Sequence, residues 1–284
     1  MKLGVISDCF KKPMKESIEL AGKLQLDGIQ IYAVGGDFCP DALLGYPEKI
    51  EAYKKLLQEQ GLKVSALCGD LGGHGFELAS ENPTRIEKTN RIVDLACEFG
   101  ATVVTTHIGV IPADETCEKY QVMLEALQAC GAYAAQRGVT LAIETGPEIA
   151  PVLAGFVKKA GKGVGVNLDP ANFVMVTGQD PAEAVYLLKD HIVHTHLKDG
   201  KMLKKTDPLK IYSHFAEGGI EALNIADYFI ETPVGEGDVD FEAYIAALKD
   251  IGYDGFLTIE RETGADPSAD IRKAAEYARA NFNL

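Results

Sequence analysis

Short apolar segments rich in β-branched residues alternate with longer helical segments along this 284-residue chain. The apolar spacing predicts helices in segments such as Met14–Leu24, Tyr46–Gln60, Pro83–Phe99, Glu115–Gln136 and Pro181–Leu188. The expected strands between them are Lys2–Ser7, Gly28–Ala33, Lys63–Cys68, Thr102–Thr106, Thr140–Glu144, Gly163–Leu168, Ile192–Leu197 and Gly255–Ile259. Strands that alternate with helices pair in parallel through right-handed crossovers, so the sequence indicates an α/β fold.

Eight such units with almost continuously apolar strands favour closure into a single (β/α)8 barrel spanning residues 1–284. The alternative is an open, doubly wound sheet, but no Gly-x-Gly-x-x-Gly motif follows the first expected strand. One irregular stretch, at about 199–233, is long for a barrel loop. Long loops at the catalytic face commonly close over substrate, although a surface insertion without a role is the other reading.

Composition restricts the partners of the chain. The formal net charge of −14 argues against nucleic-acid binding, which requires Lys and Arg to neutralise phosphates. No apolar run approaches the roughly 20 residues that cross a bilayer, and the segment Met1–Asp8 lacks a signal-peptide core. The six cysteines show no Cys-x-x-Cys spacing and are expected to be reduced thiols. We therefore expect a cytoplasmic protein with neither nucleic acid nor membrane as a partner.

Four of the expected strands carry a residue that is able to bind a metal at, or next to, their carboxyl end. Alternate residues of a barrel strand point inwards, and the functional ones lie at the carboxyl ends. In Thr140–Glu144 the Leu and Ile point outwards, so the final glutamate points into the mouth of the barrel. The same alternation in the other strands selects a complete set of four inward residues, namely Glu144, Asp169, His196 and Glu260.

Two glutamates, one aspartate and one histidine suit one hard or borderline divalent ion. Mn2+ is the preferred candidate, with Mg2+ and Co2+ as alternatives, while Zn2+ favours more nitrogen and sulfur ligands. Any one of these residues alone would be read as a solvated residue of the rim. Four at matched positions predict a metal site.

Other polar residues are expected near the same rim. His107 directly follows the fourth strand and His74 lies in a glycine-rich loop after the third, and both are candidates for binding substrate oxygens. Lys198 points inwards beyond His196, whereas His194 lies one layer deeper and is expected to support the site from below.

The most characteristic segments of the chain are His194–Asp199 and Pro233–Phe241, the latter followed by Leu248–Gly255 and Glu260. With these segments the chain resembles the xylose-isomerase-like barrel superfamily, which contains sugar isomerases and epimerases, inosose dehydratases and apurinic endonucleases. The resemblance spans essentially the whole chain. In ketose 3-epimerases of this superfamily one metal is held by Glu, Asp, His and Glu, and this pattern falls on Glu144, Asp169, His196 and Glu260.

The chain departs from the ketose 3-epimerase pattern at three positions. Asn172 stands where these enzymes often have a histidine, and its amide remains able to donate to a substrate oxygen. Met202 replaces a substrate-binding arginine, and Ala150 replaces a glutamate. The resemblance implies that Lys198 supplies the missing positive donor, as a lysine does in the branch similar to inosose dehydratases.

The resemblance implies a metal-dependent sugar isomerase or epimerase in which Glu144 and Glu260 move a proton next to a carbonyl through a cis-enediolate. The substrate would be a small sugar or polyol ketone. The alternative is a lyase acting on an inosose or a 3-keto-glycoside at the same site. A phosphodiesterase similar to the apurinic endonucleases and a non-catalytic sugar-binding barrel are less favoured. A homo-oligomer is left open.

Overall fold

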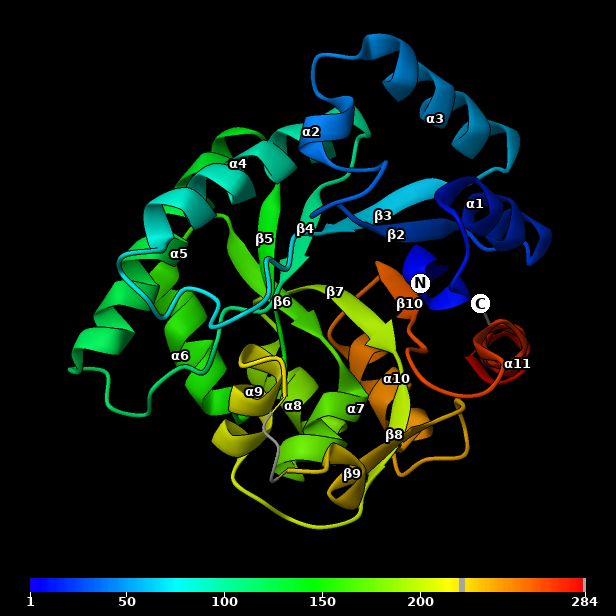
Figure 1. Cartoon of the computed structure of the whole chain (residues 1–284). Coiled ribbons are helices and arrows are strands. Elements are labelled where there is room, and N and C mark those ends of the chain that lie inside the picture. Colours follow the sequence, from blue (N-terminus) through cyan, green and yellow to red (C-terminus); the bar gives the residue numbers. More distant parts are fainter. Residues whose placement is uncertain (220–222, 283–284) are drawn as a thin grey trace.

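The computed structural model describes residues 1–219 and 223–282. Within them, parallel strands form a closed barrel in the order β1, β2, β3, β4, β5, β6, β7 and β10, and helices surround it (Figure 1). The barrel strands are β1 (Lys2–Ile6), β2 (Gly28–Tyr32), β3 (Lys63–Cys68), β4 (Val103–Thr106), β5 (Thr140–Glu144), β6 (Val164–Leu168), β7 (Ile192–Leu197) and β10 (Phe256–Ile259). The predicted (β/α)8 barrel is confirmed, and the open sheet is excluded.

The helices outside the barrel follow the strands one by one, as crossovers between parallel strands require. They are α1 (Met14–Lys23), α3 (Pro47–Glu59), α4 (Asn82–Glu98), α5 (Glu118–Gln136), α6 (Ala150–Ala160), α8 (Pro181–Leu188), α10 (Phe241–Asp250) and α11 (Pro267–Phe282). Shorter turns are η1 (Ser7–Phe10), α2 (Pro40–Leu43), α7 (Pro170–Asn172) and the π-helical η2 (Phe173–Thr177).

Helix α10 illustrates how the sequence builds these layers. Phe241, Tyr244, Ile245 and Leu248 recur at helical spacing and are buried. Asp240 caps the first turn, since its carboxylate accepts a hydrogen bond from the amide of residue 243 at 3.0 Å. The apolar stripe therefore faces the barrel, while the strands beneath are almost wholly buried. No helix within the described residues is long and apolar enough to span a bilayer.

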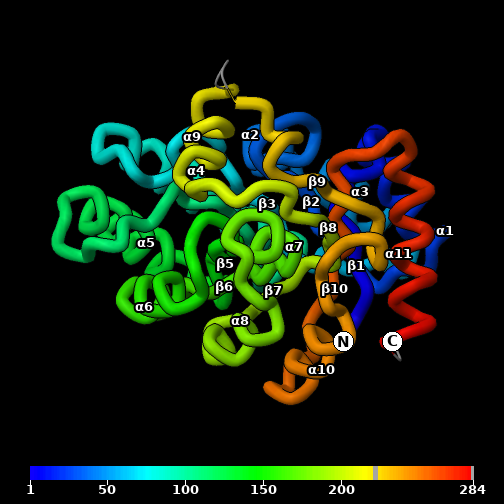
Figure 2. The backbone as a smooth tube through the Cα atoms, turned by 90° about the horizontal axis from the view of Figure 1, so that it is seen from below, coloured from blue at the N-terminus to red at the C-terminus, as the bar shows by residue number. Residues whose placement is uncertain are grey.

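The segment between β7 and β10 is more regular than the sequence suggests. It contains β8 (Asp199–Met202), α9 (Pro208–Ala216), η3 (Ile225–Asp227) and β9 (Phe229–Thr232), and β8 pairs with β9 as an antiparallel ribbon. The prediction of an irregular loop at about 199–233 is therefore wrong for most of that stretch, and residues 220–222 of it lie outside the described residues. In Figure 2, α9 lies at the end of the barrel opposite the N-terminus. We call residues 199–219 and 223–232 the cap.

One carboxylate attaches the base of the cap to the chain that follows it. Asp199 is buried and accepts hydrogen bonds from the backbone amides of Gly235 and Gly237, at 2.9 and 2.8 Å, and of Val239 at 3.2 Å. It also accepts one from the amide of Gly200 at 2.9 Å. Gly237 approaches so closely that a Cβ there would lie 1.9 Å from Oδ1 of Asp199. A glycine is therefore required at this position.

Candidate metal centre and active site

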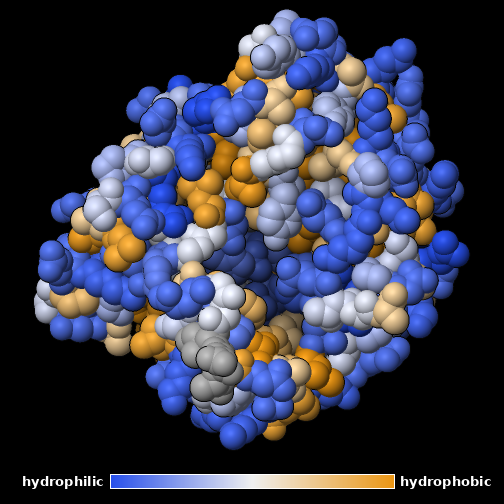
Figure 3. Space-filling model, viewed as in Figure 1, coloured by the Kyte–Doolittle hydropathy of each residue, from blue (hydrophilic) through white to orange (hydrophobic). Residues whose placement is uncertain are grey.

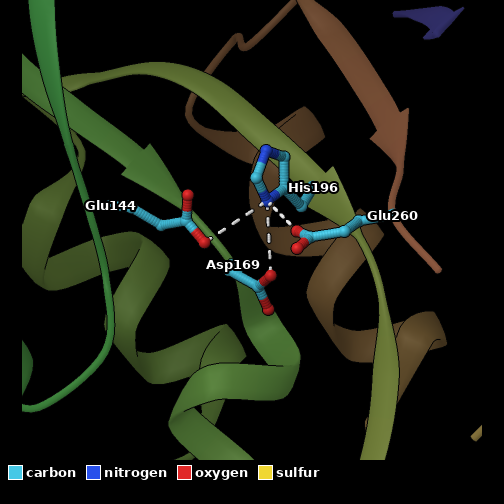
Figure 4. Close-up of side chains that lie close together, drawn as sticks. All are labelled: Glu144, Asp169, His196 and Glu260. Atoms are coloured by element: carbon cyan, nitrogen blue, oxygen red, sulfur yellow. Dashed lines mark hydrogen bonds and ion pairs between the residues drawn. The ribbon is translucent and has the colours of Figure 1, made fainter. Parts of the chain in front are cut away.

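The four predicted ligands converge at the carboxyl end of the barrel. Glu144 ends β5, Asp169 follows β6, His196 lies in β7 and Glu260 follows β10. All four are buried, and one ligand atom from each lies within 4.8 Å of the others. Figure 4 shows the three carboxylates directed at the imidazole of His196. The four residues selected from the alternation of inward and outward side chains thus lie together in the structure.

The imidazole nitrogen Nδ1 of His196 is the centre of this group. It lies 2.6 Å from Oε2 of Glu260, 3.3 Å from Oδ2 of Asp169 and 3.7 Å from Oε1 of Glu144. Oε2 of Glu260 is buried, and its short contact with Nδ1 of His196 lacks the geometry of a regular hydrogen bond. Three buried carboxylates that converge on one ring nitrogen fit a shared divalent cation. The chemistry of the donor set is therefore compatible with one metal ion.

The charges of the cluster support the same interpretation. Burial alone would lower the pKa of His196, but Glu260 and Glu144 outweigh it and hold the pKa well above its usual range. Burial raises the pKa of Glu144, and the negative charges of Glu260 and Asp169 raise it further. Three carboxylates close together in a buried site require positive charge, which a bound cation would supply.

Lys198 supplies one positive charge beside the cluster. Its ammonium group donates to Oε1 of Glu260 at 2.8 Å and to Oε2 of Glu262 at 3.1 Å. Burial would raise the pKa of Glu260, but Lys198 and His196 outweigh this effect and hold the pKa well below its usual range. Glu260 is therefore held more firmly in its ionised form than Glu144.

The remaining predicted residues line the same cavity, whose volume is about 960 Å³. Nε2 of His107 lies 3.7 Å from Oε1 of Glu144, and its Nδ1 lies 3.2 Å from a carboxylate oxygen of Asp70. Burial would lower the pKa of His107, but Glu144 and Asp70 outweigh it and raise the pKa to about 10. Asn172 donates to Oε1 of Glu144 at 3.3 Å. His107 and Asn172 thus lie next to the cluster.

His74 is farther out, at the rim of the cavity. It lies in the loop between β3 and α4, and its Nε2 is 2.9 Å from a carboxylate oxygen of Glu217, just after α9. This contact joins the cap to the opposite side of the mouth. Figure 3 shows the mouth as a hollow in this face, with hydrophilic residues at its depth.

Gln30 is a residue of the site that the sequence interpretation missed. Its Oε1 lies 3.3 Å from Nε2 of His196 and 2.9 Å from Nε2 of His194, and its amide donates to Thr105 at 3.2 Å. This leaves Nδ1 of His196 facing the carboxylates. The signal in the sequence is that Gln30 is a polar residue inside the otherwise apolar strand Gly28–Tyr32. In the structure its side chain is 1% exposed. His194 lies beneath His196, as expected.

Replacing Gln30 by Met is expected to weaken Mn2+ binding by roughly 10–100-fold, because Nε2 of His196 loses its acceptor at 3.3 Å and keeps only the amide nitrogen of Asn167 at 3.1 Å, which is a donor. Titration calorimetry on the metal-stripped protein measures this change. Thr105→Val is the matched control. Among the hydrogen bonds of the described residues, Thr105 accepts one from Gln30 and makes none with either histidine. Equal Mn2+ affinity in Gln30→Met and the unmodified chain would contradict the orienting role.

Comparison with known protein families finds a match to one family. Residues 18–281 match the family described as "Xylose isomerase-like TIM barrel". The structure is similar to a xylose isomerase domain protein from Planctomyces limnophilus, with a TM-score of 0.78 and 24% identity over 100% of this chain and 98% of that one.

Two curated relatives are similar over shorter stretches. An inosose dehydratase from Clostridium perfringens is 25% identical over 182 residues, which are 59% of this chain and 56% of the relative. An L-ribulose-5-phosphate 3-epimerase from Salmonella choleraesuis is 41% identical over 71 residues, 23% of this chain and 25% of the relative. The match thus spans about half the length of the first relative and a quarter of the second. On the match over residues 18–281, the chain belongs to the xylose isomerase-like TIM barrel family.

Proposed function

We propose that this chain is a metal-dependent enzyme that removes a proton next to the carbonyl of a small polyhydroxy ketone, with epimerisation or isomerisation as the outcome. The convergence of Glu144, Asp169, His196 and Glu260 within 4.8 Å carries this proposal. All of them except Asp169 line the cavity. A divalent cation held by these residues, Mn2+ before Mg2+, Co2+ or Zn2+, would polarise the carbonyl and acidify the adjacent C–H bond.

Glu144 and Glu260 are the proposed acid and base. They lie on either side of His196 and Asp169, on strands separated in the barrel by β6 and β7 (Figure 4). One carboxylate removes a proton from one face of the substrate, and the other returns a proton to the opposite face, which inverts the carbon. Return to the neighbouring carbon moves the carbonyl instead, which is isomerisation.

Polar side chains around the cluster would hold the hydroxyl groups of the substrate. His107 and Asn172 lie beside Glu144, Lys198 lies beside Glu260, and His74 is at the rim. These groups include several N–H donors, which suit the oxygen atoms of a sugar or polyol. Fixing these oxygens places one C–H bond against a carboxylate, and such positioning contributes much of the rate of an enzyme.

Elimination is the second candidate, favoured by the position of Lys198. Its ammonium group is 2.8 Å from Oε1 of Glu260, so an acid lies beside the proposed base. If the substrate carries a leaving group β to the carbonyl, the carboxylate takes the α-proton, the C–O bond breaks, and Lys198 gives a proton to the departing oxygen. The similarity to an inosose dehydratase over 59% of the chain supports this alternative.

Stripping the metal is expected to abolish exchange of the α-proton, and Mn2+ is expected to restore it. The measurement is deuterium uptake by NMR in D2O, with ketoses, inososes and 3-keto-glycosides as a panel. The product then separates the outcomes: an inverted carbon indicates epimerisation, a moved carbonyl isomerisation and a lost substituent elimination. Exchange that is equal with and without metal, or absent for every member of the panel, would contradict the proposal.

A further inference from the structure

The cavity above the proposed metal cluster has two sides of different character. Its floor is polar and carries Glu144, His196 and Lys198. One side is formed by the cap, which contributes residues from α9, η3 and β9. We call the following cap residues the apolar wall: Leu209, Tyr212, Phe215, Phe229 and Ile230.

Part of the apolar wall is open to solvent. Phe215 is 58% exposed, Leu209 46% and Ile230 40%, although all three line the cavity. Adjacent apolar side chains that remain in contact with water are typical of surfaces that bind an apolar group. Figure 3 shows hydrophobic residues along parts of the rim of the hollow.

The apolar wall is continuous with the proposed reaction centre. The ring of Tyr212 lies 6.2 Å from the ring of His107, whose Nε2 is 3.7 Å from Oε1 of Glu144. Tyr212 also reaches the chain just after β5, since a Cβ on Gly146 would lie 1.8 Å from its hydroxyl oxygen. A molecule with one end at the cluster therefore meets the apolar wall with its other end.

The charged lining does not favour a phosphate at that other end. The lysines that line the cavity, within the described part of the chain, are Lys119 and Lys198, and no arginine joins them. Lys119 lies 2.7 Å from a carboxylate oxygen of Glu77, and Lys198 contacts Glu260 and Glu262. With carboxylates already paired to both lysines, an anionic group would be repelled more than held.

We infer that the substrate is a polyhydroxy ketone joined to an uncharged apolar group, such as an aromatic ring system, and that the apolar wall binds this group. The inference rests on the proposed function and names its substrate class. The cavity volume of about 960 Å³ agrees with it, being near the upper end of the roughly 300–1,000 Å³ typical of ligand sites. A free sugar would leave the apolar wall uncovered.

The test compares two glucosides that carry no ketone and differ only in their aglycone. Titration calorimetry on the full chain loaded with Mg2+ measures the dissociation constants of 2-naphthyl β-D-glucoside and methyl β-D-glucoside. We expect the naphthyl compound to bind at least about tenfold more tightly. Phe215→Ala and Leu209→Ala are each expected to reduce this preference severalfold. Leu187→Ala is the matched control, because Leu187 is 43% exposed on α8 and does not line the cavity.

Equal affinity for the two glucosides, including no measurable binding of either, would overturn the inference. An unchanged preference for the naphthyl compound in Phe215→Ala would also overturn it. A third contradicting result is a smaller molar mass of Phe215→Ala in light scattering with naphthyl binding unaltered, because the apolar wall would then be an interface between two copies of the chain. Deuterium exchange separates the two proposals. If free ketoses take up deuterium but the naphthyl glucoside does not bind more tightly, the proposed function stands and the apolar site does not. If the naphthyl glucoside binds more tightly but no ketose takes up deuterium, the apolar site stands and the proposed function does not.

Discussion

Glu260→Gln is expected to lower the rate of α-proton exchange by about 10²–10⁴-fold, because an amide neither accepts the proton nor returns it. The replacement has nearly the same shape, and Lys198 keeps its contact with Glu262 at 3.1 Å, so the barrel is expected to remain folded. The initial rate of deuterium uptake at saturating Mn2+ measures the loss. Circular dichroism and Mn2+ titration separate it from unfolding and from weaker metal binding.

Glu262→Gln is the matched control for this variant. Glu262 also accepts a hydrogen bond from Lys198, but its side chain is half exposed and it is not one of the four clustered residues. Its replacement is expected to change the exchange rate by less than about tenfold, as for the loss of one solvent-exposed ion pair. Retained exchange in Glu260→Gln at saturating metal would remove Glu260 from the acid–base assignment.

Asp199→Ala is expected to destabilise the chain by about 3–5 kcal/mol, among the largest effects of a single substitution. The carboxylate accepts four backbone hydrogen bonds, from residues 200, 235, 237 and 239, and the residue is 1% exposed. Its removal leaves the amides of residues 200 and 239 without an acceptor in a buried place, and those of residues 235 and 237 in a partly buried one. Guanidinium chloride unfolding, followed by circular dichroism, measures the free energy.

Asp207→Ala provides the comparison within the same segment. Asp207 is exposed and accepts one amide hydrogen bond, from Leu209 at 3.0 Å, as the N-cap of α9. Its loss is expected to cost about 1 kcal/mol, the usual effect of removing a helix cap. Similar free energies of unfolding for the two variants would show that Asp199 does not anchor the cap.

The barrel and the four clustered residues could be predicted because both follow from local alternation. In β5, Leu141 and Ile143 are buried against the helices, which turns Glu144 to the inside. The carboxyl ends of parallel strands all meet at one end of a barrel, so inward residues there become neighbours without further information. That these residues bind a metal, and that Glu144 and Glu260 act as acid and base, remain predictions.

Gln30 could not be assigned a role because its partners are distant along the chain. It meets His196, 166 residues away, on a strand that is not adjacent to β2 in the barrel. The regularity of the cap escaped prediction for a related reason. Asp199 pairs with Thr232 across the ribbon, and its carboxylate depends on the backbone path near Gly237. Such contacts follow from the tertiary structure and leave no periodic pattern in the sequence.

The closure of the barrel has a consequence for synthesis. β1 and β10 pair in register, with Lys2 opposite Phe256 and Val5 opposite Ile259, so the sheet closes only after the eighth barrel strand has left the ribosome. Glu260 follows that strand directly. A chain interrupted after His196 but before this point has Glu144, Asp169 and His196 but neither a closed barrel nor the third carboxylate. The proposed chemistry thus becomes available only at a late stage of translation, which keeps unfinished chains inactive.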